Sequence, residues 1–311
     1  MSIISIVVPC FNEEEALPLF YKEILNVIKF LPEQNFEIIF VDDGSKDKTL
    51  SLLRDFSKRN NQVKYLSFSR NFGKESAMLA GLKSAHGDFV AIMDADMQDP
   101  PSLLPEMYDL LSDGYDCVAS RRVTRKGEPH IRSFCARCFY KFMNRISDVD
   151  IVDGARDFRL MTRQMVDAIL SVNEYNRFSK GIFCWVGFST KWLEYENVER
   201  VAGESKWSFA KLLKYSFDGI TAFSTTPLAF SSFVGFIFCL ISLMLAVVYA
   251  MKTIVWGEKV TGFPTLICII LLVGGLLLFS IGILGKYLAE TYLETKRRPA
   301  FIIKETEQSI R

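Results

Sequence analysis

The sequence has almost no excess of either charge and very little histidine. Its 311 residues include 37 Lys and Arg against 36 Asp and Glu, a formal net charge of +1, and only two histidines. There is also no basic stripe with interleaved aromatic residues, so we expect no nucleic-acid partner. His86 is expected at the exposed end of a helix, and His130 falls in a basic loop.

Cysteine patterns that bind metal are lacking as well. The seven cysteines are scattered, and Cys135 and Cys138 form one C-x-x-C without the second pair that a zinc site needs. This usage fits reduced thiols and a cytosolic face. The N-terminus has no basic start, and Pro9, Asn12 and Glu13 interrupt its apolar run, so we expect no signal peptide.

Charge is missing altogether from two long windows near the C-terminus. No charged residue occurs over residues 219–251 or over residues 260–285. Each window exceeds the run of about 20 apolar residues that crosses a bilayer. We therefore predict transmembrane helices at 228–251 and 263–286. Because Lys and Arg cluster before the first span and after the second, both flanks are expected in the cytosol.

An amphipathic pattern precedes the first predicted span. Over Trp207–Ile220, five apolar residues share one face of a helix while the charged residues lie elsewhere. Such a helix suits the headgroup region of a membrane. A helix packed on the core of the preceding domain is the alternative.

Short apolar runs rich in β-branched residues alternate with helical patterns in the first third of the chain. The runs predict strands at 3–8, 36–41, 63–68 and 89–93, and the helical patterns lie at 14–30, 47–60 and 74–85. This alternation is typical of βαβ units with a parallel sheet. A polar cluster follows each strand, so we expect these clusters to converge at the carboxyl edge of the sheet.

The run at 89–93 leads directly into Asp94, Ala95 and Asp96, with Gln98 two residues further on. Two carboxylates at the end of a buried strand project oxygen ligands into the crevice where an open α/β sheet binds its ligand. A divalent cation that holds a diphosphate prefers such hard oxygen donors. Paired acids at strand ends are also common as solvated loop residues, and the pattern alone leaves both interpretations open.

Four stretches in combination resemble the family 2 glycosyltransferases of the GT-A fold. They are Ile-Val-Val-Pro-Cys-Phe-Asn-Glu-Glu, Val-Asp-Asp-Gly-Ser, Ser-Arg-Asn-Phe-Gly-Lys and Met-Asp-Ala-Asp-Met-Gln-Asp-Pro-Pro. More narrowly, the chain is similar from about Ile3 to Phe301 to the polyprenyl-phosphate glycosyltransferases, which include bactoprenol glucosyltransferases and dolichol-phosphate mannose synthases. The resemblance implies an α/β, Rossmann-like, mixed and mainly parallel sheet with helices on both faces, followed by a C-terminal two-helix transmembrane hairpin.

We accordingly predict four parts. They are a cytosolic GT-A domain at 1–200, an amphipathic juxtamembrane segment at 201–227, the membrane helices at 228–286 and a cytosolic tail at 287–311.

The resemblance implies an inverting, metal-dependent transferase at the cytosolic face of the cell membrane. UDP-glucose is the expected nucleotide-sugar donor and undecaprenyl phosphate the expected lipid acceptor. N-acetylglucosamine, mannose or a modified arabinose are the alternative sugars. We also expect a homo-oligomer through the spans, although Gly282 and Gly285 do not have the small-x-x-x-small spacing.

Two other functions are less consistent with the sequence. A processive polysaccharide synthase would carry a Gln-x-x-Arg-Trp motif and usually more spans, and the chain has no such motif. An inactive sugar-nucleotide-binding scaffold has no chemical reason to keep Asp94, Asp96 and Gln98 intact.

The resemblance also implies roles for individual residues. Asp96 and Gln98 are the expected ligands of Mg²⁺ or Mn²⁺, and Asp94, Asp96 and Asp157 are the expected catalytic carboxylates. Asp157 is expected as a base or as a group that positions the sugar. The residues expected at the nucleotide sugar are Pro9, Phe11, Glu13, Asp42, Asp43, Arg70, Lys74, Asp94 and Ala95. Those expected at the lipid phosphate or diphosphate are Arg121, Arg132, Arg200, Ser205 and Lys206.

Three residues have simpler interpretations. We expect Ser45 to cap the following helix and Arg122 to be an ordinary surface charge. Arg156 stands where the resembling family has a small or apolar residue, and a local salt bridge from Arg156 to Asp157 would weaken the assignment of Asp157 as a base.

Overall fold

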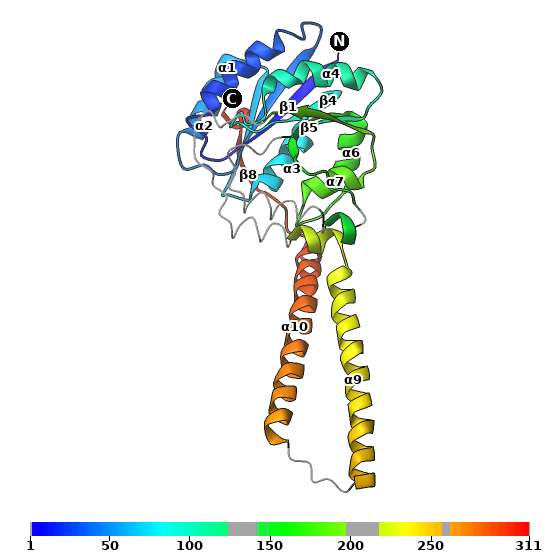
Figure 1. Cartoon of the computed structure of the whole chain (residues 1–311). Helices are drawn as coiled ribbons and strands as arrows, with labels where there is room; N and C mark the ends of the chain where they lie inside the picture. Colours follow the sequence, from blue (N-terminus) through cyan, green and yellow to red (C-terminus); the bar gives the residue numbers. More distant parts are fainter. Residues whose placement is uncertain are drawn as a thin grey trace. The chain divides into compact units, whose positions relative to one another are not determined.

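The chain folds into an α/β domain and a separate pair of long helices. The computed structural model describes residues 2–123, 141, 143–147, 149–196, 218–256 and 262–310. One compact unit comprises residues 1–219 together with 298–311, and the second comprises residues 220–297 (Figure 1).

A single eight-stranded sheet organises the α/β domain. Its strands are β1 (Ile3–Cys10), β2 (Asn35–Asp42), β3 (Val63–Phe68), β4 (Phe89–Ile92), β5 (Cys117–Arg122), β6 (Ala155–Thr162), β7 (Thr190–Tyr195) and β8 (Ile303–Thr306). Their order is β7-β5-β6-β4-β1-β2-β3-β8. β1 to β4 pair in parallel, whereas β6 and β8 run antiparallel to their neighbours. The chain runs outward from β1 to β3 and returns on the other side of β1 as β4, which creates a switch point between β1 and β4.

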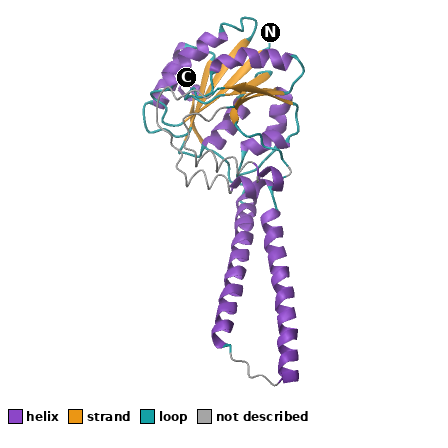
Figure 2. Ribbon diagram, viewed as in Figure 1, coloured by secondary structure: helices purple, strands orange, loops and turns teal. Residues whose placement is uncertain are grey.

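Helices cover both faces of this sheet (Figure 2). They are α1 (Leu17–Ile28), α2 (Thr49–Arg59), α3 (Lys74–Ser84), α4 (Leu104–Ser112), α6 (Arg163–Ser171) and α7 (Ser179–Trp185). Because side chains alternate along β1, Ile4, Ile6 and Val8 pack with α1, α2 and α4 in the main core. Val7 faces α3, where a Cβ on Gly81 would lie 2.1 Å from Val7 Cγ1. The glycine therefore allows α3 to approach the sheet closely.

The predicted fold class is confirmed, and all four predicted strands and three predicted helices are present. Their ends differ by a few residues. The helix predicted from residue 14 begins at Leu17, because the N–H groups of Glu13 and Glu14 donate to the side chains of Thr49 and Asp47 instead. These bonds tie the β1–α1 loop to the β2–α2 loop.

The C-terminal residues supply an edge strand. β8 pairs with β3, and the Glu305 carboxylate accepts two hydrogen bonds from Arg54, at 2.8 and 2.6 Å, and one from the Tyr65 hydroxyl at 2.7 Å. Phe301 stacks on Phe68 with 5.1 Å between ring centroids. Residues 298–311 of the predicted cytosolic tail at 287–311 are therefore part of the α/β domain. An unpaired β3 edge would expose a row of backbone donors and acceptors, and β8 satisfies them.

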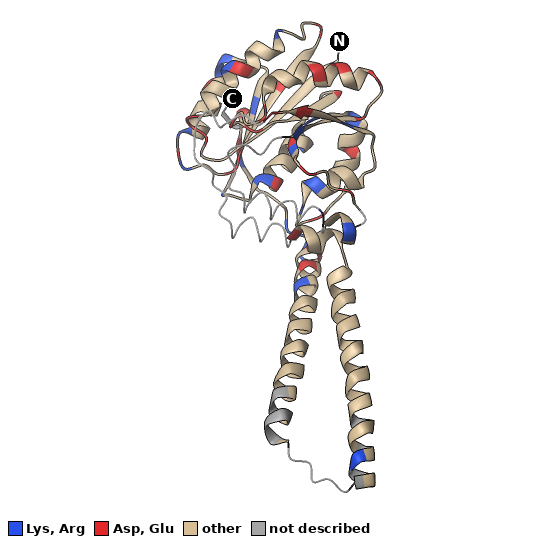
Figure 3. Cartoon of the chain, in the orientation of Figure 1, with Lys and Arg blue, Asp and Glu red and all other residues tan. Residues whose placement is uncertain are grey.

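Two apolar helices make up the second unit. They are α9 (Thr226–Trp256) and α10 (Phe263–Thr295), and each contains a stretch long and apolar enough to cross a membrane. Those stretches, Thr226–Tyr249 and Ile269–Thr295, have mean hydropathies of 2.5 and 2.3 and are not buried. Figure 3 shows how few charges they carry. The helices indicate association with a membrane.

Both helices extend beyond the predicted spans, and α9 runs from Thr226 to Trp256 where 228–251 was predicted. α10 continues past residue 286, where the predicted span ended, to Thr295, and Lys286 pairs with Glu290 one turn later at 2.5 Å. The amphipathic helix predicted over 207–220 lies, up to residue 217, outside the described residues.

We predict that Glu305→Gln lowers the free energy of unfolding by about 1–2 kcal/mol, because the partly exposed Arg54 and the buried Tyr65 lose a charged acceptor. The hydrogen bonds from Arg54 lower the pKa of Glu305 to about 2. The contribution of Glu305 is therefore full above its unfolded pKa of about 4.3 and is lost as the pH falls toward 2. Urea unfolding at several pH values measures it. Asp55→Asn, an exposed change on the same helix as Arg54, is the control. An equal loss in both variants, or a loss that grows at low pH, would contradict the prediction.

Candidate functional site

Asp94 and Asp157 come together because β4 and β6 are antiparallel. Ile92 pairs with Arg159, and the same register continued by two residues sets Asp94 opposite Asp157. Asp94 follows the end of β4 and Asp157 lies inside β6. Both carboxylates therefore stand beside the switch point of the sheet, where α/β folds bind ligands.

Lys74 joins these two carboxylates. Its Nζ lies 2.7 Å from Asp94 Oδ1 and 2.5 Å from Asp157 Oδ2. Burial alone would lower the pKa of Lys74, but the two carboxylates outweigh it and raise that pKa well above the usual range. Burial alone would raise the pKa of Asp157, but Lys74 and then Lys180 outweigh it and hold that pKa well below the usual range. At neutral pH Lys74 is therefore protonated and Asp157 is ionised.

The loop that delivers Lys74 is held by Asp43. Its carboxylate accepts backbone hydrogen bonds from Phe72 at 2.6 Å and from Gly73 at 2.9 Å, immediately before α3 begins. Burial raises the pKa of Asp43 to about 6 against these hydrogen bonds. Asp42 accepts from the Ser67 hydroxyl at 2.7 Å and is equally buried. The two acids predicted at the nucleotide thus also stabilise the fold: Asp43 holds the loop before α3, and Asp42 bonds to strand β3.

The turn after β4 presents the two predicted metal ligands. The N–H of Gln98 donates to Asp96 Oδ1 at 3.1 Å. Met97 between them has a φ of 53°, a left-handed conformation that costs a non-glycine residue about 1 kcal/mol or more. Strained backbone conformations of this kind are typical of functional sites.

Arg156 contacts this turn and not Asp157. Its Nε donates to Asp99 Oδ1 at 2.9 Å and its Nη2 donates to Gln98 Oε1 at 3.2 Å. The possible salt bridge from Arg156 to Asp157 is therefore not formed, since Asp157 pairs with Lys74. Successive side chains of a strand point to opposite sides, which separates Arg156 from its neighbour. The Tyr195 hydroxyl also donates to Asp99 Oδ1. Asp99 and Tyr195 were not singled out from the sequence.

The oxygen donors of this turn fit a hard divalent cation. Asp96 offers a buried carboxylate and Gln98 an amide oxygen, and Asp99 Oδ2 is buried without a hydrogen-bond partner among the described residues. No cluster of three or more His, Cys, Asp or Glu placed to hold a metal occurs in the described part of the chain. Mg²⁺ usually keeps only one or two carboxylates and takes further oxygens from water and substrate phosphate, so the residues present suit an ion bound together with a diphosphate.

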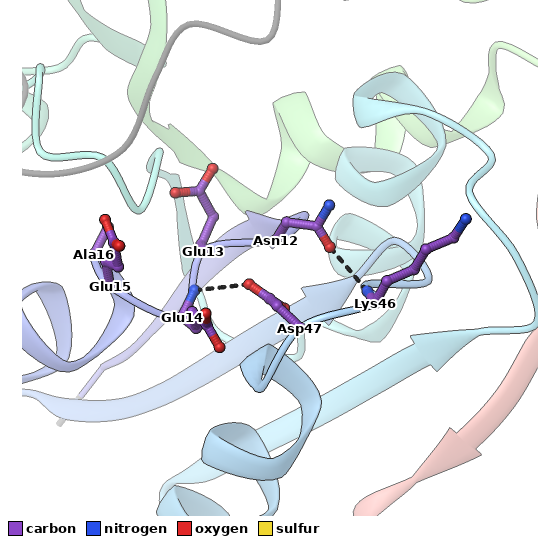
Figure 4. Close-up of a pocket in the computed structure, with 7 residues that line it drawn as sticks. All are labelled: Asn12, Glu13, Glu14, Glu15, Ala16, Lys46 and Asp47. Carbon is purple, nitrogen blue, oxygen red and sulfur yellow. Dashed lines mark hydrogen bonds between the residues drawn. The ribbon is translucent and has the colours of Figure 1, made fainter.

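A pocket of about 380 Å³ opens at the carboxyl ends of β1 and β2 (Figure 4). It is lined by Asn12, Glu13, Glu14, Glu15, Ala16, Lys46 and Asp47. The Asn12 side-chain oxygen accepts from the Lys46 N–H at 2.8 Å and bridges the two loops. Four carboxylates and one lysine line this pocket, so it does not suit a diphosphate. Glu13 is the one lining residue that was predicted at the nucleotide.

The other predicted residues lie at several places. Pro9 and Phe11 are half-buried at the end of β1, and Ala95 is buried between the two acids. Arg70 lies over the Phe72 ring at 4.2 Å. Arg121 is separated from β4 by β6 and pairs with Glu194 at 3.2 Å. The remaining predicted residues fall outside the described residues. They are Arg132, Arg200, Ser205 and Lys206.

Ser45 does not cap a helix. The helix α2 begins four residues later, at Thr49. The Ser45 hydroxyl instead accepts a hydrogen bond from the Asn12 N–H at 2.9 Å, because the β1–α1 and β2–α2 loops lie against each other. The interpretation as a cap was wrong.

Comparison with known proteins gives consistent matches. Residues 5–170 match the model of glycosyl transferase family 2. The chain is 43% identical over 303 residues to a putative glycosyltransferase, CsbB, of Bacillus subtilis (strain 168), covering 97% of this chain and 92% of that protein. It is 42% identical over 305 residues to the bactoprenol glucosyl transferase of Shigella phage SfV, covering 98% and 99%. A prophage bactoprenol glucosyl transferase homolog of Escherichia coli (strain K12) is 41% identical with the same coverage.

We predict that Lys74→Met changes how stability depends on pH. Without the ammonium, two carboxylates face each other, and one of them then binds a proton at a raised pKa. Because a raised carboxyl pKa costs stability as the pH increases, the variant should gain on the order of 1–3 kcal/mol between pH 8 and pH 5 relative to the native protein. Thermal and urea unfolding measure the difference. Lys83→Met, on the last turn of the same helix, is the control. Parallel profiles for Lys74→Met and the native protein would show that the ion pairs do not set these ionisation states.

Proposed function

Because the chain belongs to glycosyl transferase family 2, we propose that this glycosyltransferase moves a glucosyl group from UDP-glucose to the phosphate of a polyprenyl lipid. The observation that carries the proposal is Lys74 between Asp94 and Asp157, at the sheet edge that also bears Asp96 and Gln98. The names of the relatives supply the donor sugar and the lipid class.

The donor diphosphate belongs at the turn after β4. Asp96 and Gln98 would hold Mg²⁺ or Mn²⁺ there, and such an ion stabilises the charge that develops on the leaving diphosphate. Asp94 and Ala95 would contact the ribose or the sugar. Asp42 and Asp43 lie at the end of β2, which β1 separates from β4, and suit the base and ribose. Lys74, whose Nζ lies 2.7 Å from Asp94 Oδ1, would hold Asp94 in place for this contact.

The acceptor phosphate needs no general base. A phosphate monoester has a second pKa of about 6 and is mostly doubly ionised at neutral pH. Its oxygen forms a bond to C1 of the sugar while the bond from C1 to the diphosphate breaks, and UDP leaves with the electron pair. Direct attack inverts the configuration at C1. The lowered pKa of Asp157 makes it a poor base, so we assign Asp157 to positioning the sugar.

The lipid acceptor fits a chain that associates with membranes. We place α9 and α10 across the bilayer, with the α/β domain and both termini in the cytosol, where positive charges flank the spans. Arg121, Arg132 and Arg200, with Ser205 and Lys206, are the proposed contacts of the lipid phosphate or diphosphate. Arginine presents a planar fork that suits phosphate oxygens.

Transfer to lipid tests the proposal directly. Detergent-purified protein is incubated with undecaprenyl phosphate, Mg²⁺ or Mn²⁺, and one radiolabelled donor at a time from a panel of UDP- and GDP-sugars. We expect label in the organic phase from UDP-glucose, and none after EDTA is added, because the diphosphate then lacks its cation. Label from another sugar alone would replace the donor and keep the reaction. Nucleotide binding without lipid label from any donor would contradict the proposed acceptor.

We predict that Asp96→Asn abolishes this transfer and changes the free energy of unfolding by less than about 1 kcal/mol. Clustered acids at a cation site usually cost stability, so their loss removes function before folding. Transfer assays and urea unfolding measure the two effects, with Asp109→Asn, at an exposed position of α4, as the control. A large loss of stability would mean that the carboxylate is structural.

A further inference from the structure

The cluster around Arg156 has no part in the proposed reaction, yet it adjoins a proposed metal ligand. Arg156 stands in β6, one residue before Asp157, and its guanidinium reaches the turn after β4. Its side chain is only 25% exposed, and that of its partner Asp99 is 2% exposed. An ion pair buried to this degree is costly to form unless its geometry is well defined.

The geometry of the cluster is well defined. Asp99 Oδ1 accepts from Arg156 Nε at 2.9 Å and from the Tyr195 hydroxyl, so the carboxylate is fixed from two strands, β6 and β7. Burial and Asp99 raise the pKa of the Tyr195 hydroxyl above its usual range, which keeps it a hydrogen-bond donor. The guanidinium is therefore held in one place, and its Nη2 points at Gln98 Oε1 at 3.2 Å.

A guanidinium can pair only with the oxygen of a side-chain amide, because it has no hydrogen-bond acceptor. Arginine has five N–H donors and no acceptor, so the Gln98 atom at 3.2 Å must be the oxygen and not the NH₂ group. An amide oxygen has two lone pairs, and the hydrogen bond from Arg156 uses one of them. A hard cation binds oxygen, so the orientation that satisfies Arg156 also keeps the Gln98 oxygen at the turn.

We propose that Arg156 is a positioning residue for metal binding: clamped by Asp99 and Tyr195, it fixes the side-chain amide of Gln98 with its oxygen available to a divalent cation bound with the nucleotide diphosphate. This inference rests on the proposed metal role of Asp96 and Gln98. Asp99 neutralises the charge of the guanidinium, which limits its repulsion of the cation. Groups that orient a metal ligand from behind typically change metal affinity about 10–100-fold when they are removed.

The test compares Arg156→Met with a matched variant. Arg163 follows β6, its side chain is 30% exposed, and it donates to the Gly87 carbonyl at 2.9 Å. Arg163→Met therefore removes the same charge with similar burial, away from the turn. Binding of Mn²⁺ to full-length protein with UDP is measured from the free-ion signal in electron paramagnetic resonance. We expect Arg156→Met to weaken Mn²⁺ binding about 10-fold or more, with Arg163→Met unchanged and Arg156→Lys intermediate.

Tyr195→Phe gives a second measurement that keeps every charge. It removes only the hydroxyl bound to Asp99, and we expect a smaller loss of Mn²⁺ affinity, about two- to fivefold, because Asp99 then holds Arg156 less firmly. Urea unfolding shows that each variant is folded under the conditions of the titration.

The outcomes separate this inference from the function it rests on. If the native protein binds no Mn²⁺ with UDP, the proposed metal site fails, and this inference fails with it. If the native protein binds Mn²⁺ and folded Arg156→Met binds it equally well or more tightly, the positioning role is overturned and the metal site stands. Equal losses in Arg156→Met and Arg163→Met would likewise overturn the positioning role, since charge alone would explain them.

Discussion

The ammonium group of Lys74 is the contact on which the arrangement of the site depends. It joins the start of α3, the end of β4 and the interior of β6, three segments that are far apart in the sequence. Two carboxylates this close would repel each other and one would take up a proton, as paired acids do elsewhere. Lys74 lies between them and holds the pKa of Asp157 well below its usual range. Asp43 supports this arrangement because it holds the loop that ends at Lys74.

The charge of this group also limits the chemistry. A carboxylate paired with lysine is a weak proton acceptor, so the site suits a nucleophile that arrives already ionised. A lipid phosphate meets that requirement, whereas an alcohol acceptor would need a base. The membrane helices and the site are thus both consistent with a lipid phosphate as acceptor. The helices fit an acceptor that resides in a membrane, and the lowered pKa of Asp157 fits one that needs no base.

The sequence predicted the half of the fold in which local signals are strong. Alternating apolar runs and helical patterns located β1 to β4 and the helices between them, and the residues after each strand indicated one edge. Pairings that join distant segments had no local signal. Asp94 meets Asp157 through an antiparallel register, and Arg156 meets Asp99 because side chains alternate along β6.

β8 was not predicted, because it too has no strong local signal. It is four residues long and follows a long helix, so period-two alternation has too few positions to show. Its place in the sheet comes from contacts made across the chain, between Glu305 and Arg54 and between Phe301 and Phe68. By contrast, charge-free windows longer than a bilayer span are strong local signals, and both apolar helices were found from them.

In the proposed reaction the nucleophile arrives ionised, and Lys74 keeps Asp157 from acting as its base. The pH dependence of kcat/KM for the acceptor tests it most directly, because that ratio reports ionisations of the free enzyme and free substrate. Asp43 also titrates at about pH 6, so two acceptors are needed: polyprenyl phosphate and its phosphonate analogue, whose second pKa is higher. The account predicts an acid limb with a midpoint at about pH 6 for the phosphate and a higher midpoint for the phosphonate. The same midpoint with both acceptors would assign the limb to an enzyme carboxyl group and contradict the account.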